Sequence, residues 1–444
     1  MPSRITHLYD NKGLLFFLVL MIGFILNPAE GKGARRDHPI RPFTDTRPVK
    51  AVVQRQWTPL LEADPVIQGV VDEIDWNGLA AKIGWLENFE TRYSYTPQCE
   101  AAGDSLFEYF SNLGLSVVKR HFIWDDVDMW NVEATQTGTI YPDSIFIICG
   151  HYDSISEDAY NLAPGADDNA SGTAAVMTAA QILSQHPTNY AIKYVLFAGE
   201  EQGLIGSYYY VQDAVSLGMA IVGVLNADML GWWSSGADFD LEIETNTDSQ
   251  WLAAAVTNAA DLYTNMPYEL HIEDNAWWGD HWYFWQAGFA AVNHEESYDL
   301  VDPDFNPYYH TTQDVLDHID PDFTVGNVKI LVAALTTLAQ LQDATGVTDQ
   351  FETPSLTLRA DPNPFHNGVT ICLTTSGKLL AADLGIFNIG GRLIATLPVR
   401  LQGGRGTATW RASELSSIHL SSGVYFCRPL GMRSARPIEL IYIK

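Results

Sequence analysis

The sequence predicts an α/β fold, in which helices cover both faces of a mostly parallel central sheet, followed by a small all-β domain. Four short apolar runs, at residues 144–149, 192–197, 221–225 and 288–292, each begin or end at Gly, Asp or Asn and resemble buried strands. They are interspersed with helical stretches at residues 101–113, 172–184, 249–263 and 321–341. Beyond residue 351 the apolar residues instead alternate with period two between turn residues, which is typical of an antiparallel sandwich.

The amino-terminal region reads as a signal peptide. An uninterrupted apolar run of 13 residues, 14–26, follows Arg4 and Lys12 and precedes the small residues Ala29 and Gly31. The run is short for a bilayer span, although an uncleaved membrane anchor is the alternative. We expect a signal peptide at residues 1–31, a linker or pro-segment at 32–60, and an exported mature protein, secreted or at the cell surface, with no stable membrane span.

The charge of the chain excludes one class of partner. The formal net charge is −29, and it is unevenly distributed: residues 1–50 hold 8 basic and 4 acidic side chains, and residues 351–444 hold 10 and 5. The body between them is therefore strongly acidic. A general nucleic-acid-binding protein needs a basic face, so we expect no nucleic-acid partner.

Four cysteines are divided between the two predicted domains. Cys99 and Cys149 lie in the body, and Cys372 and Cys427 lie in the carboxyl-terminal domain. An exported protein can form disulfides, and independent domains would allow only the pairing within each. Cys149 follows an apolar stretch, so an ordinary buried thiol is the alternative there.

Metal-ligand residue types follow each predicted strand. His151 and Asp153 follow the first strand, Glu200 and Glu201 the second, and Asp228 the third. Two more positions complete the pattern, namely Asp167-Asp168, which directly precede a helical stretch, and His310, which lies beyond the fourth strand. Because ligands bind beyond the carboxyl ends of parallel strands, these side chains converge, and His with Asp and Glu but no thiolate suits zinc.

Each piece has a simpler explanation when taken alone. Asp167-Asp168 before a helix could be a capping turn, and a single histidine is more often an ordinary polar residue than a ligand. Adjacent strand residues point to opposite faces, so Glu200 and Glu201 serve one site only if the chain leaves the strand there. Gly199, with glycines at 203 and 206, makes such a turn plausible.

The combination resembles a known family. The stretches GHYDS, PGADDNASG, AGEEQGLIGS, NADM, GDHWYFWQAG and YYHTTQD occur in the order found in co-catalytic zinc exopeptidases of the bacterial leucyl aminopeptidase type. Plasma glutamate carboxypeptidase and glutaminyl cyclase are relatives. The resemblance covers roughly residues 85–341 and implies a phosphorylase/hydrolase-like catalytic domain, which we place at residues 61–346.

The resemblance also implies roles for the residues and two zinc ions. His151 and Asp228 would bind one zinc, Glu201 and His310 the other, and Asp167 would bridge them. Glu200 would be the general base and Asp153 would orient the histidine, while Asp168 and Asp314 could act similarly or serve only as turn residues. The family motif at Asp280-His281 lies near the substrate cleft, and neither residue is expected to be a ligand.

The implied reaction is removal of the first residue from a peptide with a free amino terminus. Two zinc ions about 3.5 to 4 Å apart would share and activate a water whose proton Glu200 accepts. A carboxypeptidase or glutaminyl cyclase, and a binding protein without catalysis, are the alternatives. An apolar pocket for the first side chain could come from aromatic and thioether side chains, although these tryptophans could equally be packing residues: Met229, Trp277, Trp278, Trp282, Trp285, Tyr308 and Tyr309.

The carboxyl-terminal domain, residues 351–444, resembles two known domains. The stretches NPF, IFNIGGRLIATL, SSGVYF and IELIYIK are similar to the sorting domain of type IX secretion substrates and to the immunoglobulin-like domain of flagellar hook-capping proteins. The segment TWRASELSS departs from the turn usual in the first of these. The resemblance implies an immunoglobulin-like β-sandwich that the export machinery recognises.

Overall fold

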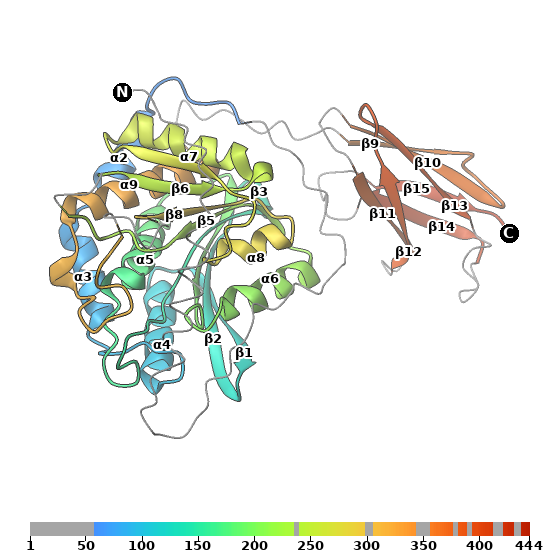
Figure 1. The fold of residues 1–444 in the computed structure, drawn as a ribbon. Helices are drawn as coiled ribbons and strands as arrows, with labels where there is room; N and C mark the ends of the chain where they lie inside the picture. Colours follow the sequence, from blue (N-terminus) through green and yellow to red (C-terminus); the bar gives the residue numbers. More distant parts are fainter. Residues whose placement is uncertain are drawn as a thin grey trace.

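The computed structural model describes residues 57–234, 239–297, 305–342, 356–375, 381–388, 393–411, 421–429 and 437–444. The predicted signal peptide and most of the predicted linker lie outside these described residues. Figure 1 shows the described chain as an α/β part, residues 57–342, and an all-β part that begins at residue 356. The two types of sequence pattern therefore correspond to two types of structure.

An eight-stranded sheet forms the centre of the α/β part, in the order β1-β2-β4-β3-β5-β8-β6-β7. Strands β4, β3, β5 and β8 are parallel to one another, whereas β1 and β2 are antiparallel additions and β6 is antiparallel to β8. The strands are β1 Ser116–Trp124, β2 Val127–Gln136, β3 Tyr141–His151, β4 Tyr190–Phe197, β5 Ala220–Ala227, β6 Leu241–Thr245, β7 Tyr268–Ile272 and β8 Ala291–Glu295. The predicted mostly parallel sheet is confirmed.

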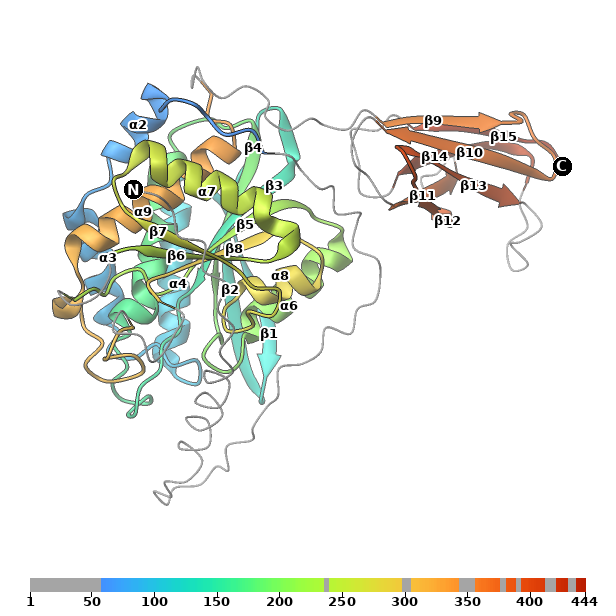
Figure 2. The same ribbon diagram turned by 45° about the horizontal axis from the view of Figure 1, so that its top comes forward.

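Helices cover both faces of this sheet (Figure 2). One face packs against α2 Pro65–Asp72, α3 Trp76–Glu87, α4 Pro97–Asn112, α5 Gly172–Leu183, α7 Gln250–Tyr263 and α9 Pro321–Leu338. The other face packs against α6 Ile205–Leu217 and α8 His281–Gln286. Strand β3 shows the alternation, because Phe146 and Ile148 belong to the first core, and Ile147 and Cys149 to the second.

The element bounds differ from the predicted ones in informative places. Asp320 caps α9 by accepting a hydrogen bond of 2.8 Å from the Phe323 N–H. The fourth strand begins at Ala291 rather than at Gly288, because Gly288 has a φ of 78° and closes the end of α8. The sequence analysis did not predict α2, α3, α6 or the outer strands β1, β2, β6 and β7.

All four cysteines are free thiols, so the structure forms neither of the disulfides that the sequence allowed. Cys99 lies in the core on one face of the central sheet and Cys149 in the core on the other face. In the all-β part, Cys427 is fully buried in the core, whereas Cys372 lies on the half-buried side of β10. The sheet geometry directs the members of each pair apart.

The all-β part consists of two antiparallel sheets, β13-β10-β9 and β12-β11-β14-β15. Its strands are β9 Leu356–Asp361, β10 Gly368–Thr375, β11 Ala381–Asn388, β12 Leu393–Arg400, β13 Arg405–Arg411, β14 Gly423–Pro429 and β15 Ile438–Tyr442. Both sheets contribute to one core, in which Trp410 packs edge-on against Tyr425. Two sheets around one core make a sandwich, as the period-two pattern predicts. The immunoglobulin-like topology stays a prediction.

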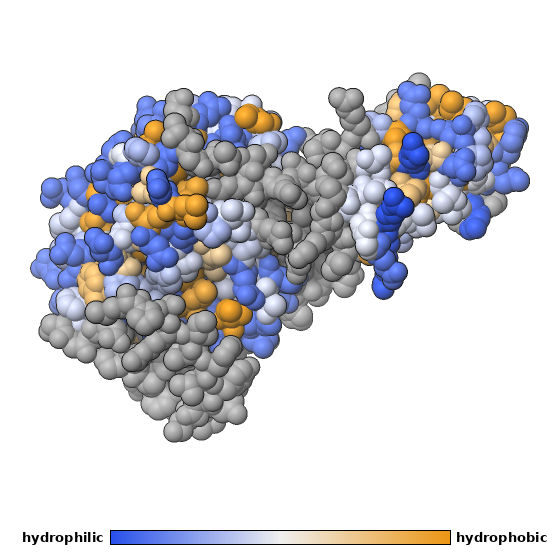
Figure 3. All heavy atoms as spheres, turned by 90° about the horizontal axis from the view of Figure 1, so that it is seen from above, coloured by the Kyte–Doolittle hydropathy of each residue, from blue (hydrophilic) through white to orange (hydrophobic). Residues whose placement is uncertain are grey.

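The surface is mostly hydrophilic on the face shown in Figure 3. Figure 3 shows hydrophilic residues over much of the described surface on one face, with hydrophobic residues in separate small groups. Isolated apolar side chains of this kind are normal on a protein surface. Among the described residues, no helix has the length and apolarity that a membrane span requires.

Candidate metal centre

The carboxyl ends of three adjacent parallel strands carry the predicted ligands. His151 is the last residue of β3, Asp228 directly follows β5, and Glu200 and Glu201 lie three and four residues after the end of β4. Gly199 has a φ of 73° and Gly203 a φ of 105°, so the chain turns out of β4 at the glutamate pair. The predicted turn is confirmed, and it removes the strand alternation that would have separated Glu200 from Glu201.

A single carboxylate, that of Asp168, lies between the two histidines. Asp168 Oδ1 is 3.2 Å from His151 Nε2, and Asp168 Oδ2 is 3.2 Å from His310 Nε2. Each histidine has a second carboxylate: His151 Nε2 is 3.2 Å from Asp228 Oδ1, and His310 Nε2 is 3.0 Å from Glu201 Oε2. The five side chains therefore form two His–carboxylate pairs that share one aspartate.

The expectation that Asp167 bridges the two pairs is wrong. Both oxygens of the buried Asp167 carboxylate accept hydrogen bonds from groups outside the histidine cluster. The Gly231 N–H donates to one oxygen at 2.7 Å, and the Asn306 side-chain N–H donates to the other at 2.9 Å. Asp167 thus ties together the segments that follow Asp228 and precede His310. Asp168, which the sequence analysis treated as a supporting residue, occupies the shared position instead.

Asp314 sets the direction of the Asp167-Asp168 turn. Its two carboxylate oxygens accept the N–H groups of Asp167 at 2.9 Å and of Asp168 at 3.0 Å. Gly165, just before this turn, has a φ of 53°, and a Cβ there would lie 2.4 Å from the Asp168 carbonyl oxygen. Only glycine fits that position, so the bend that presents Asp168 depends on Gly165 and on Asp314.

Asp153 contacts both His151 and the glutamate turn, as predicted for a residue that orients the histidine. Its carboxylate lies 3.4 Å from His151 Nδ1 and accepts the N–H groups of Glu200 and Glu201, each at 3.3 Å. The Ser94 hydroxyl donates to the same carboxylate at 2.8 Å and accepts the Gly199 N–H at 3.1 Å. One carboxylate therefore couples the histidine of β3 to the glutamate turn after β4.

Arg92 is a structural residue that the sequence analysis missed. It is fully buried, and its guanidinium donates to the carbonyl oxygens of Leu86, Tyr152, Pro164 and Gly165 at 2.6 to 3.1 Å. These carbonyls lie next to His151 and on the turn before Asp168. The only sequence signal would have been a basic residue in an apolar neighbourhood, and that signal does not reveal its partners.

The side-chain amide of Asn169 links the Asp168 turn to the strand that carries Asp228. Its oxygen accepts from the Gly172 N–H at 2.9 Å and the Met229 N–H at 3.3 Å, while its nitrogen donates to the Ala227 carbonyl at 2.9 Å. Asn169 is fully buried. The amide therefore fixes the spacing between the Asp168 and Asp228 carboxylates.

The buried charges perturb one another strongly. Burial opposes charging of His310, but the carboxylates of Glu201 and Asp168 raise the pKa of this imidazole to about 10. Burial and the neighbouring Asp168 raise the pKa of Glu201 to about 7. Burial alone also favours the neutral form of Asp168, yet hydrogen bonds from both histidines hold its pKa below the usual range. Such a concentration of perturbed groups is typical of a functional site.

The residues fit bound zinc. Ligand atoms about 2.0 to 2.1 Å from a tetrahedral zinc lie roughly 3.4 Å apart, and the four His–carboxylate separations are 3.0 to 3.2 Å. Glu201 Oε1 is buried without a hydrogen-bond partner, as expected of an oxygen that a cation would satisfy. Within the described residues, the ion pairs of these carboxylates involve only histidines, not Lys or Arg. A cation would neutralise the excess negative charge.

Glu200 differs from these five residues. Within the described part of the chain, its carboxylate makes no ion pair with either histidine. Burial raises its pKa well above the ordinary value; His151 opposes this shift and Glu201 adds to it. A carboxylate beside a metal centre, but not part of the ligand set, matches the position predicted for a general base.

Some of the aromatic residues near the site only pack in the core, whereas others contact acidic or histidine side chains of the site. Trp285 is a core residue whose indole N–H donates to the Ala291 carbonyl at 2.9 Å, and Tyr308 stacks on His318 at 3.9 Å. Tyr309 stacks on the ligand His310 at 3.6 Å, and the Trp278 indole donates to Glu244 at 3.0 Å. Asp280 and His281 are fully buried and, as expected, are not members of the His–carboxylate pairs.

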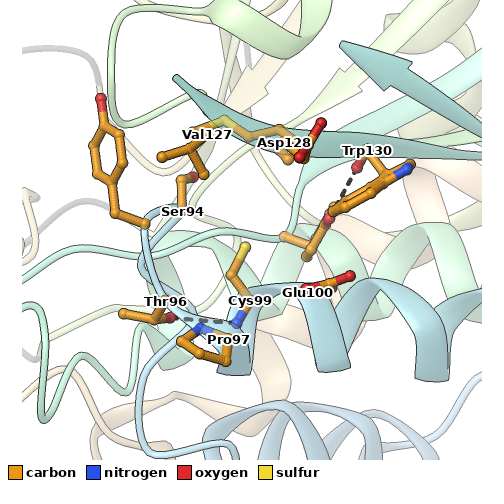
Figure 4. A pocket seen from close by; sticks show the side chains of 12 residues that line it. Ser94, Thr96, Pro97, Cys99, Glu100, Val127, Asp128 and Trp130 are labelled. Carbon is orange, nitrogen blue, oxygen red and sulfur yellow. Dashed lines mark hydrogen bonds between the residues drawn. The ribbon is translucent and has the colours of Figure 1, made fainter. Parts of the chain in front are cut away.

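A separate pocket of about 210 Å³ lies between the start of α4 and strand β2 (Figure 4). Its walls include Ser94, Cys99 and Trp130, and in the view Cys99 lies on the first turn of the helix behind Pro97. None of the five proposed ligands lines this pocket. One of its lining residues, Ser94, also bonds to Asp153.

Comparison with known proteins agrees with this geometry. Residues 131–336, which include all five ligands and Glu200, match the model of Peptidase family M28. The chain is therefore a homologue of zinc metallopeptidases and a hydrolase that acts on peptides.

Individual relatives carry similar descriptions. A "Probable zinc metalloprotease" of Pyrenophora teres f. teres is 29% identical over 62% of this chain and 69% of its own. A "Probable leucine aminopeptidase" of Arthroderma otae is 26% identical over 67% and 80%. The LapA aminopeptidase of Legionella pneumophila has a similar fold, with a TM-score of 0.56, 20% identity, and coverage of 64% of this chain and 76% of LapA.

Proposed function

We propose that this M28 peptidase is a di-zinc aminopeptidase that removes the first residue from peptides with a free amino terminus. The observation that carries the proposal is the Asp168 carboxylate, which lies 3.2 Å from each histidine while each histidine pairs with its own second carboxylate. Two equivalent donor sets joined by one carboxylate support two ions rather than one. His151 and Asp228 would hold one zinc, His310 and Glu201 the other, and Asp168 both.

The side chains of the protein would hold the zinc ions in position and transfer the proton of the attacking water. Bound zinc ions would polarise the scissile carbonyl and lower the pKa of a shared water. Glu200, which is outside the ligand set, accepts a proton from the attacking water and delivers it to the departing amine. Asp153 holds the backbone of Glu200 through its N–H at 3.3 Å, so the base keeps a defined place beside the metal centre.

The surrounding carboxylates support recognition of an amino terminus. An ionised α-amino group is cationic, and two buried carboxyl groups outside the ligand set, those of Glu200 and Asp280, interact electrostatically with His151 and Asp228. A peptide whose amino group is acylated lacks this charge. We therefore expect cleavage to require a free amino terminus and to release one residue at a time from that end.

The test combines metal analysis with a substrate panel. Purified protein should contain two zinc ions per chain by inductively coupled plasma mass spectrometry, and it should cleave aminoacyl p-nitroanilides but not their N-acetylated forms. Cleavage of the acetylated forms, release of carboxyl-terminal residues, or cyclisation of an N-terminal glutamine would refute the proposal. A stoichiometry of one zinc at full activity would refute the two-metal site.

We also propose that the protein is exported, with residues 351–444 acting as a sorting domain. The apolar run at residues 14–26 and the motifs of the carboxyl-terminal sandwich support this proposal. Expression in a host with type IX secretion should place the full-length protein outside the cell, and deletion of residues 351–444 should retain it inside. Equal export of both proteins would refute the role of this domain.

A further inference from the structure

Two buried glutamates, Glu244 and Glu295, lie beside the metal centre but take no part in the ligand set. Glu244 is on β6 and is fully buried, and Glu295 ends β8 with an exposed fraction of 8%. One Asn293 side-chain nitrogen donates to both, at 3.0 Å to Glu244 Oε2 and at 2.9 Å to Glu295 Oε2. The shared donor brings the two carboxylates together on one face of the sheet.

The position of this pair relative to the ligand Asp228 follows from the strand pairing. Strand β8 lies next to β5 with Ala227 opposite His294, and the Asp228 N–H bonds to the His294 carbonyl at 3.0 Å. Glu295 therefore lies opposite Asp228, about one strand spacing of 4.8 Å away, and Glu244 lies one strand farther out. Both glutamates therefore lie on the side of Asp228 that faces β6 and β7.

The two carboxyl groups have no positively charged partner. In the parts of the chain that the structure describes, neither glutamate forms an ion pair, and their side-chain contacts are with Asn293 and the Trp278 indole N–H. Glu244 Oε1 is buried with no hydrogen-bond partner at all. A buried carboxylate without a cation is costly, and natural proteins rarely keep one unless a ligand completes it.

The pair is also held in place rather than free to swing out to water. Asn293 accepts a hydrogen bond from the Asn226 side chain at 2.9 Å, and Asn226 in turn contacts the Cys149 thiol at 3.3 Å. These residues lie on β8, β5 and β3, so the polar chain crosses the centre of the sheet. A carboxylate pair fixed by such a network is preorganised to receive a cation.

We propose that Glu244 and Glu295 bind the side chain of the substrate's first residue, and that this residue is basic, lysine or arginine. The inference rests on the aminopeptidase function proposed above, which places the first residue of the substrate beside Asp228. A cationic head group would satisfy the unpartnered oxygen of Glu244 and balance one negative charge of the pair, whereas a leucine side chain would leave that oxygen buried and unpaired. A site built around buried polar groups discriminates strongly against ligands that lack the matching group.

Kinetics on a panel of first residues test the proposal. With lysyl, arginyl, leucyl and alanyl p-nitroanilides, the zinc-loaded wild-type enzyme should show at least a tenfold higher kcat/KM for the basic substrates. Glu295→Gln and Glu244→Gln should each lower kcat/KM for the basic substrates tenfold or more and leave that for leucine unchanged or raised. Glu269→Gln, which removes one charge from the partly exposed strand β7, is the matched control and should change neither.

Each other outcome overturns the proposal. Three results would show that the pair does not bind a basic side chain. They are a wild-type preference for leucine, an equal loss of kcat/KM on all substrates in Glu295→Gln, and recovery of the variants' kcat/KM when calcium is added. Absence of activity on every unblocked substrate would instead refute the aminopeptidase function itself. Circular dichroism and zinc content of each variant establish that it folds and holds its metal.

Discussion

The carboxylate of Asp314 holds the backbone N–H of Asp168 at 3.0 Å, although 146 residues separate them in the sequence. This contact, with its companion to the Asp167 N–H, decides which of two adjacent aspartates enters the metal centre. The tertiary structure therefore determines which aspartate joins the proposed ligand set. Substituting each aspartate separately tests this assignment.

Asp168→Asn should abolish metal binding at the shared position and reduce kcat/KM by at least a thousandfold. Asp167→Asn should have a milder effect, about 10- to 100-fold in metal affinity, as is usual for a residue that supports the ligands. Zinc content by mass spectrometry and kcat/KM on an unblocked substrate measure both effects. A larger loss in Asp167→Asn than in Asp168→Asn would contradict the assignment.

Glu200→Gln should keep both zinc ions and lose about 10²- to 10⁴-fold in kcat, because the amide has the shape of the base but cannot accept the proton. The unchanged ligand residues explain the retained metal. Steady-state kinetics with parallel zinc analysis would check this. Near-normal turnover in a zinc-loaded Glu200→Gln enzyme would exclude Glu200 as the base.

Removal of zinc should inactivate and destabilise the protein together. Without cations, the buried Asp168, Glu201 and Asp228 face one another with only two histidines to balance them. A ligand at 100 times its Kd stabilises a fold by about 2.7 kcal/mol, so chelation should lower Tm measurably. Thermal unfolding and activity before chelation, after chelation and after zinc return would show whether both recover.

Arg92→Met should destabilise the α/β part by at least about 3 kcal/mol, because it leaves four buried carbonyl oxygens without their charged donor. Arg92→Lys should recover only part of this loss, since one ammonium cannot reach all four acceptors. Urea unfolding measures the difference. Arg400→Met, at an exposed position in the all-β part, is the control and should change the unfolding free energy little.

The buried Glu133 predicts a pH dependence away from the metal centre. Burial alone would raise its pKa, but Arg120 and Lys193, both in direct contact, hold the pKa below the ordinary value. Since the folded pKa is lowered, the stabilisation is present above the unfolded pKa and is lost as pH falls through the folded value. Glu133→Gln should cost roughly 3 kcal/mol near neutral pH.

The wild-type advantage over Glu133→Gln should then shrink below about pH 4, where the wild-type carboxylate becomes protonated as well. Unfolding free energies of both proteins between pH 3 and pH 7 would test this. A difference that stays constant over that range would show that packing, rather than charge, explains the effect of the substitution.

Much of this protein could be predicted from its sequence because the signals are local. The alternation of apolar runs and helical stretches predicted the parallel centre of the sheet, and four of the five residues in the His–carboxylate cluster were among the predicted ligands. The outer strands β1, β2, β6 and β7 gave weaker signals, since they are partly exposed and mix polar with apolar residues. The disulfides that the sequence allowed do not form, because Cys99 and Cys149 lie in separate cores, and Cys372 faces away from the core that contains Cys427.

The sequence by itself determined which residue types are available and the order in which the strands deliver them to one edge of the sheet. Only the tertiary structure decided that Asp168 rather than Asp167 is shared, because the direction of two adjacent side chains in a turn depends on Gly165 and on the distant Asp314. Likewise, Glu244 and Glu295 became neighbours only when β6 paired with β8. Hydrogen bonds between segments far apart in the chain set these directions, and no local pattern encodes them.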